Sequence, residues 1–276
     1  MALTGGQIDL RRFKAGRGGG GGKGGPLNVV LDRLIVSDGI ALTGFRGSFT
    51  PRGGFNGSFT AQVNDRTRVA GTVVQMQNGT AVRLKSDDAG GVLAAAGIFA
   101  NARGGSLDLQ LAPTGEAGHY NGRADVVNVR VRNAPVMAEL LSAVSVVGLL
   151  EQLNGEGLLF SNADAEFRLT PAAIEITRGA AIGASLGVSM AGVYQVGSKR
   201  LNMQGVVSPI YLLNGLGAVF TRRGEGLFGF NYSLQGTAGA PQVSVNPLSI
   251  LTPGMFRDIF RSPAPVLGTR GPGAGG

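Results

Sequence analysis

The chain has 276 residues, of which 48 are glycine, and it contains no cysteine, no tryptophan and one histidine, His119. These counts exclude disulfides, thiolate zinc sites, cysteine nucleophiles and metal sites built from several imidazoles. The formal net charge is +8, and the first 25 residues contribute half of it, with five basic side chains against Asp9. A basic end segment favours weak contact with an anionic surface over a domain that tracks nucleic acid.

The N-terminal segment carries no pattern of a signal peptide, because Met1 is followed by neither a basic start nor a long apolar run. We therefore expect any export signal or membrane anchor to lie on a segment that this chain lacks. The glycine run at 18–25 predicts a flexible loop.

Most of the chain after this loop alternates between apolar and polar residues, with Gly-containing turn signals between the alternating runs. Such a period of two is typical of strands with one dry and one wet face. The turn signals are Asp38-Gly39 and the Asn-Gly pairs that begin at Asn56, Asn78, Asn121, Asn154 and Asn214. The clearest strands are predicted at 107–111, 127–131, 163–169, 186–190, 201–203 and 228–234. Short strands at this spacing predict a long antiparallel meander.

Helical patterns are few, and all of them lie in the second half of the chain. Apolar residues at helical spacing follow Pro135 and predict a helix to Leu150, ending at Asn154-Gly155. Shorter helices are predicted at 209–220 and 246–260, and the Pro/Gly-rich stretch 263–276 is predicted to be a disordered tail. The apolar run 134–150 is short for a membrane span and contains Glu139, which argues against a transmembrane helix.

A sheet with one dry face must cover that face with a second sheet, with helices, by closure, or with a ligand. The predicted helices are too few to cover so many strands. Small residues on the dry faces argue against a thick sandwich core, and glycine within strands suits sharp bending. The residues thus leave two options open: a curled sheet whose concave apolar face holds something oily, and a glycine-rich sandwich or β-solenoid with an ordinary core.

Three segments of the C-terminal half resemble a known family. They are GRADVVNVRVRNAPVMAELLSAVSVVGLLEQLNGEGLLFSNADAEFRLTP (122–171), GASLGVSMAGVYQVGSKRLNMQGVVSPIYLLNGLG (183–217) and GEGLFGFNYSLQGTAGAPQVSVNPLSILTPGMFRDIF (224–260). The second contains a G-x-V-x-P-x-Y-x-x-N pattern filled by Gly205, Val207, Pro209, Tyr211 and Asn214. The third carries Pro241, Asn246, Pro247, Leu248, Pro253 and Gly254. Together they are similar to the C-terminal region of the AsmA-like family, of the YhdP/TamB type, from Gram-negative bacteria.

The resemblance implies a fold and a role. The fold would be mainly β, a long antiparallel meander curled into an open taco-like groove, with two or three short helices in the C-terminal half. Residues 1–262 would form this β-groove domain, and its role would be passive phospholipid transfer between the inner and outer membranes. The chain would act at the periplasmic face of the cell envelope, associated with the membrane. An outer-membrane or envelope protein partner is a further expectation.

We expect two sets of functional residues. The set predicted to line the groove and contact phospholipid acyl chains is Phe167, Leu169, Ile174, Ile176, Leu186, Val188, Phe228 and Phe230. The set predicted to touch a membrane or a protein partner is Phe256, Arg257, Ile259, Phe260 and Arg261.

No catalytic constellation, metal site or cofactor motif is evident in the sequence, so we expect a protein that is not an enzyme. Three Arg-Gly-Gly triplets are scattered and lack the aromatic residues on which bases would stack, so no nucleic-acid partner is expected. His119 precedes Asn121-Gly122 and is expected to be a surface residue beside a turn. The alternative function is that of a structural or adhesive glycine-rich β-protein with an ordinary core and no lipid.

Overall fold

The computed structural model describes residues 2–12, 25–50, 55–145, 147–209, 229–237 and 239–246. The glycine loop at 18–24, the predicted helix at 210–220 and the tail at 263–276 lie outside these ranges, as does nearly all of the helix predicted at 246–260. Among the described residues, no helix is long and apolar enough to span a membrane.

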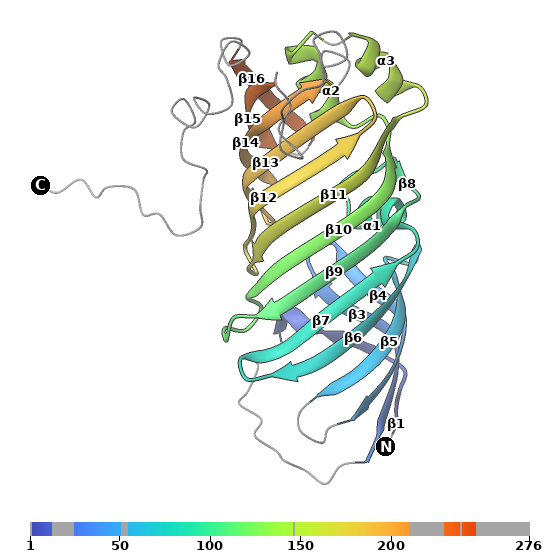
Figure 1. Cartoon of the computed structure of the whole chain (residues 1–276). Helices are drawn as coiled ribbons and strands as arrows, with labels where there is room; N and C mark the ends of the chain where they lie inside the picture. The colour runs from blue at the N-terminus through green and yellow to red at the C-terminus, as the bar shows by residue number, and fades with distance from the viewer. Residues whose placement is uncertain are drawn as a thin grey trace, which may run out of the picture.

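The described chain is a succession of strands with a few short helices (Figure 1). The strands of the first half are β1 (Ala2–Thr4), β2 (Gln7–Asp9), β3 (Leu27–Ser37), β4 (Ile40–Thr50), β5 (Asn56–Val63), β6 (Thr67–Met76), β7 (Gly79–Ser86), β8 (Ala102–Arg103), β9 (Ser106–Pro113) and β10 (Tyr120–Val131). Those of the second half are β11 (Leu158–Leu169), β12 (Ala173–Gly183), β13 (Leu186–Gln195), β14 (Arg200–Pro209), β15 (Phe230–Thr237) and β16 (Ala240–Asn246). The helices are η1 (Leu10–Arg12), α1 (Ala89–Ala95), α2 (Pro135–Ala143) and α3 (Val147–Asn154).

All 16 described strands belong to one sheet, in the order β1-β3-β4-β5-β6-β7-β9-β10-β11-β12-β13-β14-β15-β16, with β2 paired to β3 and β8 paired to β10 outside this order. From β3 to β16 each strand pairs antiparallel with the next in this order, whereas β1 and β2 pair parallel with β3. The order begins at β1 and ends at β16, so the sheet is open. Figure 1 shows it curled, with β7 to β13 in front and β3 and β4 behind them. The prediction of a mainly β, open and curled meander is confirmed.

One face of the sheet is apolar from β9 to β16, and we call it the apolar face. The strand registers place these residues on it: Leu107, Leu109 and Leu111; Gly122, Ala124 and Val126; Ala163, Ala165, Phe167 and Leu169; Ile174, Ile176, Gly179 and Ala181; Leu186, Val188, Met190 and Tyr194; Leu201, Met203, Gly205 and Val207; Phe230, Tyr232 and Leu234; Val243 and Val245. The helix α1 packs against this face through Ala89, and α1 lies behind the front strands, so the curl turns the apolar face inward (Figure 1).

An irregularity in β12 keeps this face continuous. Ile176 pairs with Gly192, and Gly179 pairs with Met190. Between these two pairs β12 therefore has one more residue than β13, which is a β-bulge. Without this bulge, the alternation would carry Ala180 rather than Gly179 to the apolar face. The bulge therefore lets two apolar runs of opposite parity share one face.

Several strand glycines lie beneath phenylalanine rings. Gly122 pairs with Phe167, and a Cβ on Gly122 would overlap that ring. Gly71 stands in the same relation to Phe59. The Asn-Gly pairs that begin at Asn56 and Asn121 were predicted to form turns, and that prediction is wrong. Both pairs lie inside strands, because the missing side chain gives an aromatic ring room to lie along the sheet.

The helices differ from the prediction in two ways. The predicted helix from Pro135 is broken into α2 and α3 around Ser145, which has a left-handed φ of 57°. The helix α1 lies in the first half of the chain, where none was predicted. It is seven residues long and is capped by Asp88, whose Oδ1 accepts a hydrogen bond from the Gly91 amide at 2.9 Å. A helix made largely of alanine and glycine is too short to show helical periodicity, so the sequence could not reveal it.

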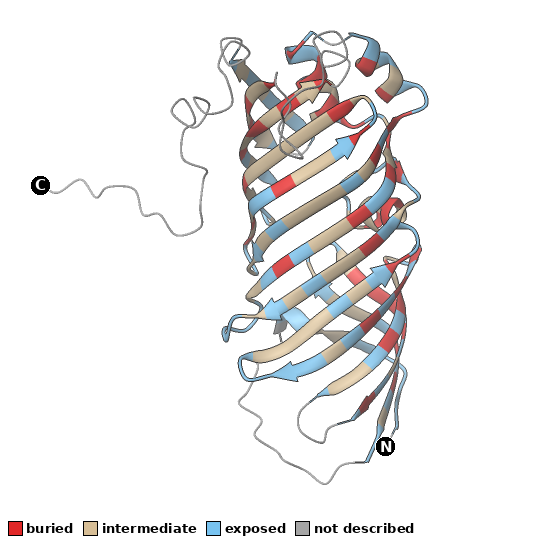
Figure 2. Cartoon of the chain, viewed as in Figure 1, coloured by how far each residue is buried: buried red, intermediate tan, exposed pale blue. Residues whose placement is uncertain are grey.

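The buried residues, drawn in red in Figure 2, occur along the whole length of the sheet. Their contacts group them into two clusters. In the first half of the sheet, stacked rings of Phe45, Phe49 and Phe59 fill the space over β4 and β5. In the second half, α2 and α3 cover part of the apolar face through Leu141 and Leu153, both fully buried. The interior is thus closed by side chains in the N-terminal part and by helices at one margin of the C-terminal part.

Candidate functional site

The apolar face is unevenly covered along its strands. The ends of β11, β13 and β14 near the helices are buried, with Leu158 at 2%, Leu186 at 1% and Val207 at 0% exposure. We call this margin the helix rim. The opposite ends of β9 to β14 are joined by turns, and we call that margin the turn rim. Toward the turn rim the apolar side chains of β11, including Phe167 and Leu169, are only half-buried.

The structure brings the described residues of the predicted lining set onto this one face. Phe167 pairs with Ile176, and Leu169 pairs with Ile174. Val188 pairs with Val207, which in turn pairs with Phe230. Of the set, Leu186 lies at the helix rim and is buried, whereas Phe167, Leu169, Ile174, Ile176, Val188 and Phe230 are half-buried. Phe228 lies outside the described residues, as do Phe256, Arg257, Ile259, Phe260 and Arg261 of the predicted membrane-contact set.

The predicted lining set omits most of the apolar face. Met190, Tyr194, Leu201 and Val243 share it with the predicted residues and are likewise half-buried. The signal was present in the alternation of each strand, but a single strand does not say which of its two faces meets the apolar face of its neighbour. The register supplies that information.

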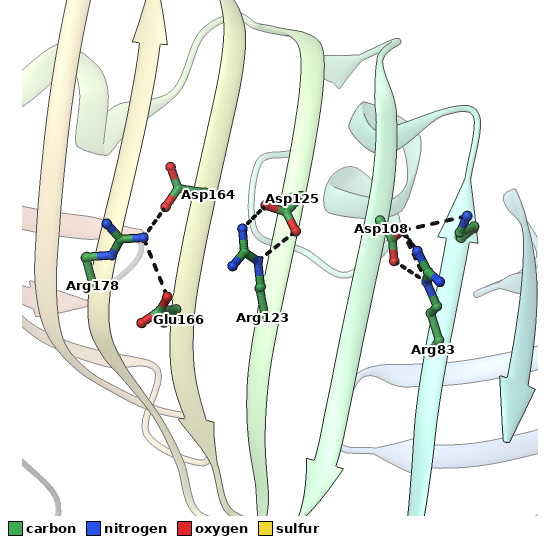
Figure 3. A network of polar contacts seen from close by, with 8 residues as sticks. Arg83, Asp108, Arg123, Asp125, Asp164, Glu166 and Arg178 are labelled. Atoms are coloured by element: carbon green, nitrogen blue, oxygen red, sulfur yellow. Dashed lines mark hydrogen bonds and ion pairs between the residues drawn. The ribbon is translucent and has the colours of Figure 1, made fainter. Parts of the chain in front are cut away.

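The opposite face is polar and carries ion pairs across neighbouring strands (Figure 3). Arg178 Nη2 lies 3.3 Å from Asp164 and 3.5 Å from Glu166. Farther along, Arg83 Nε donates to Asp108 at 2.9 Å, and this hydrogen bond holds the pKa of Asp108 below its usual value. The charges thus lie on the outer side of the curl, where water solvates them.

A hollow also lies on the polar face. It measures about 780 Å³ and crosses β3 to β7, with walls of small hydroxyl side chains such as Ser48, Ser58 and Thr60 and of the cations Arg46, Arg83 and Lys85. On β4 and β5, the polar residues Arg46, Ser48, Ser58 and Thr60 alternate with the phenylalanines Phe45, Phe49 and Phe59. The hollow is open, and its lining also includes apolar residues such as Val29, Val30 and Phe59.

A smaller hollow, of about 190 Å³, lies at the turn rim, where the β9–β10 and β11–β12 turns meet. Its lining includes Leu169 of the apolar face together with His119, Arg168 and Glu175. Glu175 is 1% exposed, and its Oε2 lies 3.6 Å from Arg168 Nη1. Nothing in the sequence marks Glu175 as buried, because it occupies a polar-face position between two isoleucines.

Neither hollow holds a metal-binding group of described residues. Within the described ranges, no group of three or more His, Asp or Glu side chains could hold a metal ion. His119, the one imidazole, binds Glu116 through Nδ1 at 2.6 Å, in the turn between β9 and β10. What the described residues form is therefore an apolar surface with a small polar pocket at its margin.

In comparisons with known proteins, no family model, curated protein or solved structure matches the chain.

Proposed function

We propose that the apolar face binds the acyl chains of phospholipids, and that the chain is a segment of an AsmA-like bridge that supports passive phospholipid transfer between the inner and outer membranes of the cell envelope. The observation that carries the proposal is the continuity of the apolar face across eight strands, β9 to β16, while its side chains toward the turn rim stay half-buried.

The energetics of the face favour an oily occupant. Each methylene removed from water recovers about 0.8 kcal/mol. Adjacent strands lie about 4.8 Å apart, so eight strands offer a path of roughly 35 Å across the sheet, longer than one acyl chain. Because the face carries no charged side chain from β9 to β16, a chain moving along it meets similar surroundings at every strand. A uniform lining of this kind suits sliding rather than fixed binding.

The sheet also separates the two parts of a phospholipid. Its tails would lie on the inner apolar face, and its headgroup would stay in water at the turn rim, where the hydrophilic turns lie. The N-terminal part of the sheet fills its own interior with phenylalanine rings, so the proposed lipid surface belongs to the C-terminal part.

Organic extraction of the purified full chain, followed by mass spectrometry, tests the proposal directly. We expect phospholipid at a defined ratio to protein, and we expect the delipidated chain to move fluorescent phospholipid from donor to acceptor vesicles. A chain that returns without lipid and moves none between vesicles would instead be a structural or adhesive β-protein, the alternative that the composition also allows.

A further inference from the structure

The pocket at the turn rim contains a buried carboxylate, Glu175, one oxygen of which lacks a hydrogen bond. The side chain of Glu175 is 2% exposed, and its Oε2 has no hydrogen-bond partner among the described residues. The nearest cationic atom, Arg168 Nη1, stands 3.6 Å away on a side chain that is 60% exposed. A buried carboxylate oxygen left without a hydrogen bond is costly, so Glu175 Oε2 is an acceptor that a bound donor would satisfy.

The register fixes this carboxylate in place. Glu175 lies opposite Arg168 on β11 and opposite Val193 on β13, and Arg168 lies opposite Asn121 on β10. The pocket therefore has a floor of three paired strands. Two turns close its sides, and each is stiffened by a threonine: Thr114 Oγ1 donates to the His119 carbonyl, and Thr170 Oγ1 donates to the Ala173 carbonyl.

We propose that this pocket binds a zwitterionic group in which a primary ammonium lies beside a phosphate, with the ammonium on Glu175 and the phosphate on Arg168. A primary ammonium has three N–H donors and needs acceptors, and the pocket offers the free carboxylate oxygen and threonine hydroxyl oxygens. Arg168 is exposed enough to leave the weak contact with Glu175 and to pair with a phosphate in two hydrogen bonds.

Other occupants fit the pocket less well. A metal ion would find one free carboxylate, because the described residues hold no group of three ligands and His119 is already bound to Glu116. A simple anion would face the carboxylate of Glu175 from inside the pocket. A trimethylammonium group has no N–H to donate, so it cannot hydrogen-bond the free carboxylate oxygen of Glu175.

The place of the pocket connects it to the apolar face. Leu169 belongs both to the pocket lining and to the apolar face, at the half-buried end of β11. Glu175 and Arg168 lie on the opposite face of the sheet, so a phospholipid with its tails on the apolar face would reach the pocket by passing its headgroup around the turn rim. This step rests on the proposed function, whereas binding of the same zwitterion as a free phosphomonoester does not.

The experiment has two arms, both on the full chain. In the soluble arm, calorimetry compares O-phosphoethanolamine with phosphocholine. We expect measurable binding of O-phosphoethanolamine only, and a loss of about tenfold in Glu175→Gln, the size expected for one charged hydrogen bond. Glu166→Gln is the matched control, because Glu166 is an exposed carboxylate on β11. Equal binding of both compounds, or equal affinities in wild type and Glu175→Gln, would overturn the pocket assignment.

In the lipid arm, the delipidated chain is incubated with vesicles of equal parts phosphatidylethanolamine and phosphatidylcholine, reisolated and extracted. Wild type should carry several-fold more phosphatidylethanolamine, and Glu175→Gln should carry both lipids equally with the total unchanged. A full lipid load without enrichment in wild type refutes the headgroup site and leaves the acyl-chain proposal standing. No lipid at all, with O-phosphoethanolamine still bound, refutes the acyl-chain proposal and assigns the pocket to a free phosphomonoester.

Discussion

A charge placed on the apolar face should interrupt the proposed lipid path, and neighbouring residues of β11 offer a matched pair to test it. Ala163 lies on the apolar face between Val126 and Ala181, and it is half-buried. Asn162, the preceding residue, is exposed on the opposite face. Ala163→Asp and Asn162→Asp therefore introduce the same charge one residue apart, on opposite sides of the sheet.

The magnitude follows from the strand spacing. Strands lie about 4.8 Å apart, so roughly four methylenes of an extended acyl chain cross one strand. A hydrated carboxylate keeps these methylenes in contact with water. The lost burial free energy is about 0.8 kcal/mol for each methylene, or about 3 kcal/mol in all. Each 1.4 kcal/mol is a factor of ten, so passage across β11 should slow by about 100-fold in Ala163→Asp.

The assay measures transfer of fluorescent phospholipid between vesicles together with the lipid that remains bound after purification. We expect Ala163→Asp to lose most of both activities and Asn162→Asp to match the wild type, with circular dichroism and thermal melting reporting that each variant folds. Should Ala163→Asp fail to fold, Leu201→Asp and Asn202→Asp on β14 repeat the comparison, since Leu201 is half-buried on the apolar face and Asn202 is exposed. Equal transfer by both members of a folded pair would refute the lipid path.

Three further outcomes are expected. Gly90→Ala should destabilise the protein by about 1–3 kcal/mol in urea denaturation, because the added Cβ would overlap the backbone of β8. Gly148→Ala in α3 adds its Cβ to open space and should stabilise the protein by up to about 1 kcal/mol. A change of the same sign in both variants would contradict the packing of α1. Because Arg83 lowers the folded-state pKa of Asp108, this exposed pair should stabilise the fold slightly at neutral pH. The difference in stability between wild type and Asp108→Asn should fade as the pH falls below about 3.9 and through the lowered value. Phe260→Asp should reduce flotation of the chain with anionic vesicles, and unchanged flotation would remove the C-terminal segment from the predicted membrane contact.

The sequence predicted the class of fold because alternation is a local property. The alternation of Leu107, Leu109 and Leu111 on β9 predicts a strand with one apolar face, and this prediction does not depend on which strands lie beside it. The same local logic failed for Asn121-Gly122, where a turn signal lies inside a strand. Its glycine is required by Phe167, which follows 45 positions later in the chain, and no short window contains both residues.

The candidate site was likewise predictable only in part. The apolar character of Phe167, Val188 and Phe230 could be read from each strand, but that they share one face follows from the register and from the bulge in β12. Glu175 was out of reach of sequence reasoning, because its burial depends on two turns and a neighbouring strand. A glutamate at a polar-face position is ordinarily solvated.

These two features place opposite demands on a bound lipid, and their arrangement resolves the conflict. Sliding requires a lining without anchoring charges, which the apolar face provides from β9 to β16. Selection among headgroups requires charges at fixed positions, which would trap a lipid if they stood in its path. Glu175 and Arg168 lie at the turn rim on the polar side of their strands, beside the path of the tails. Under the two proposals, a headgroup would be bound and released there while the tails keep their burial on the inner face.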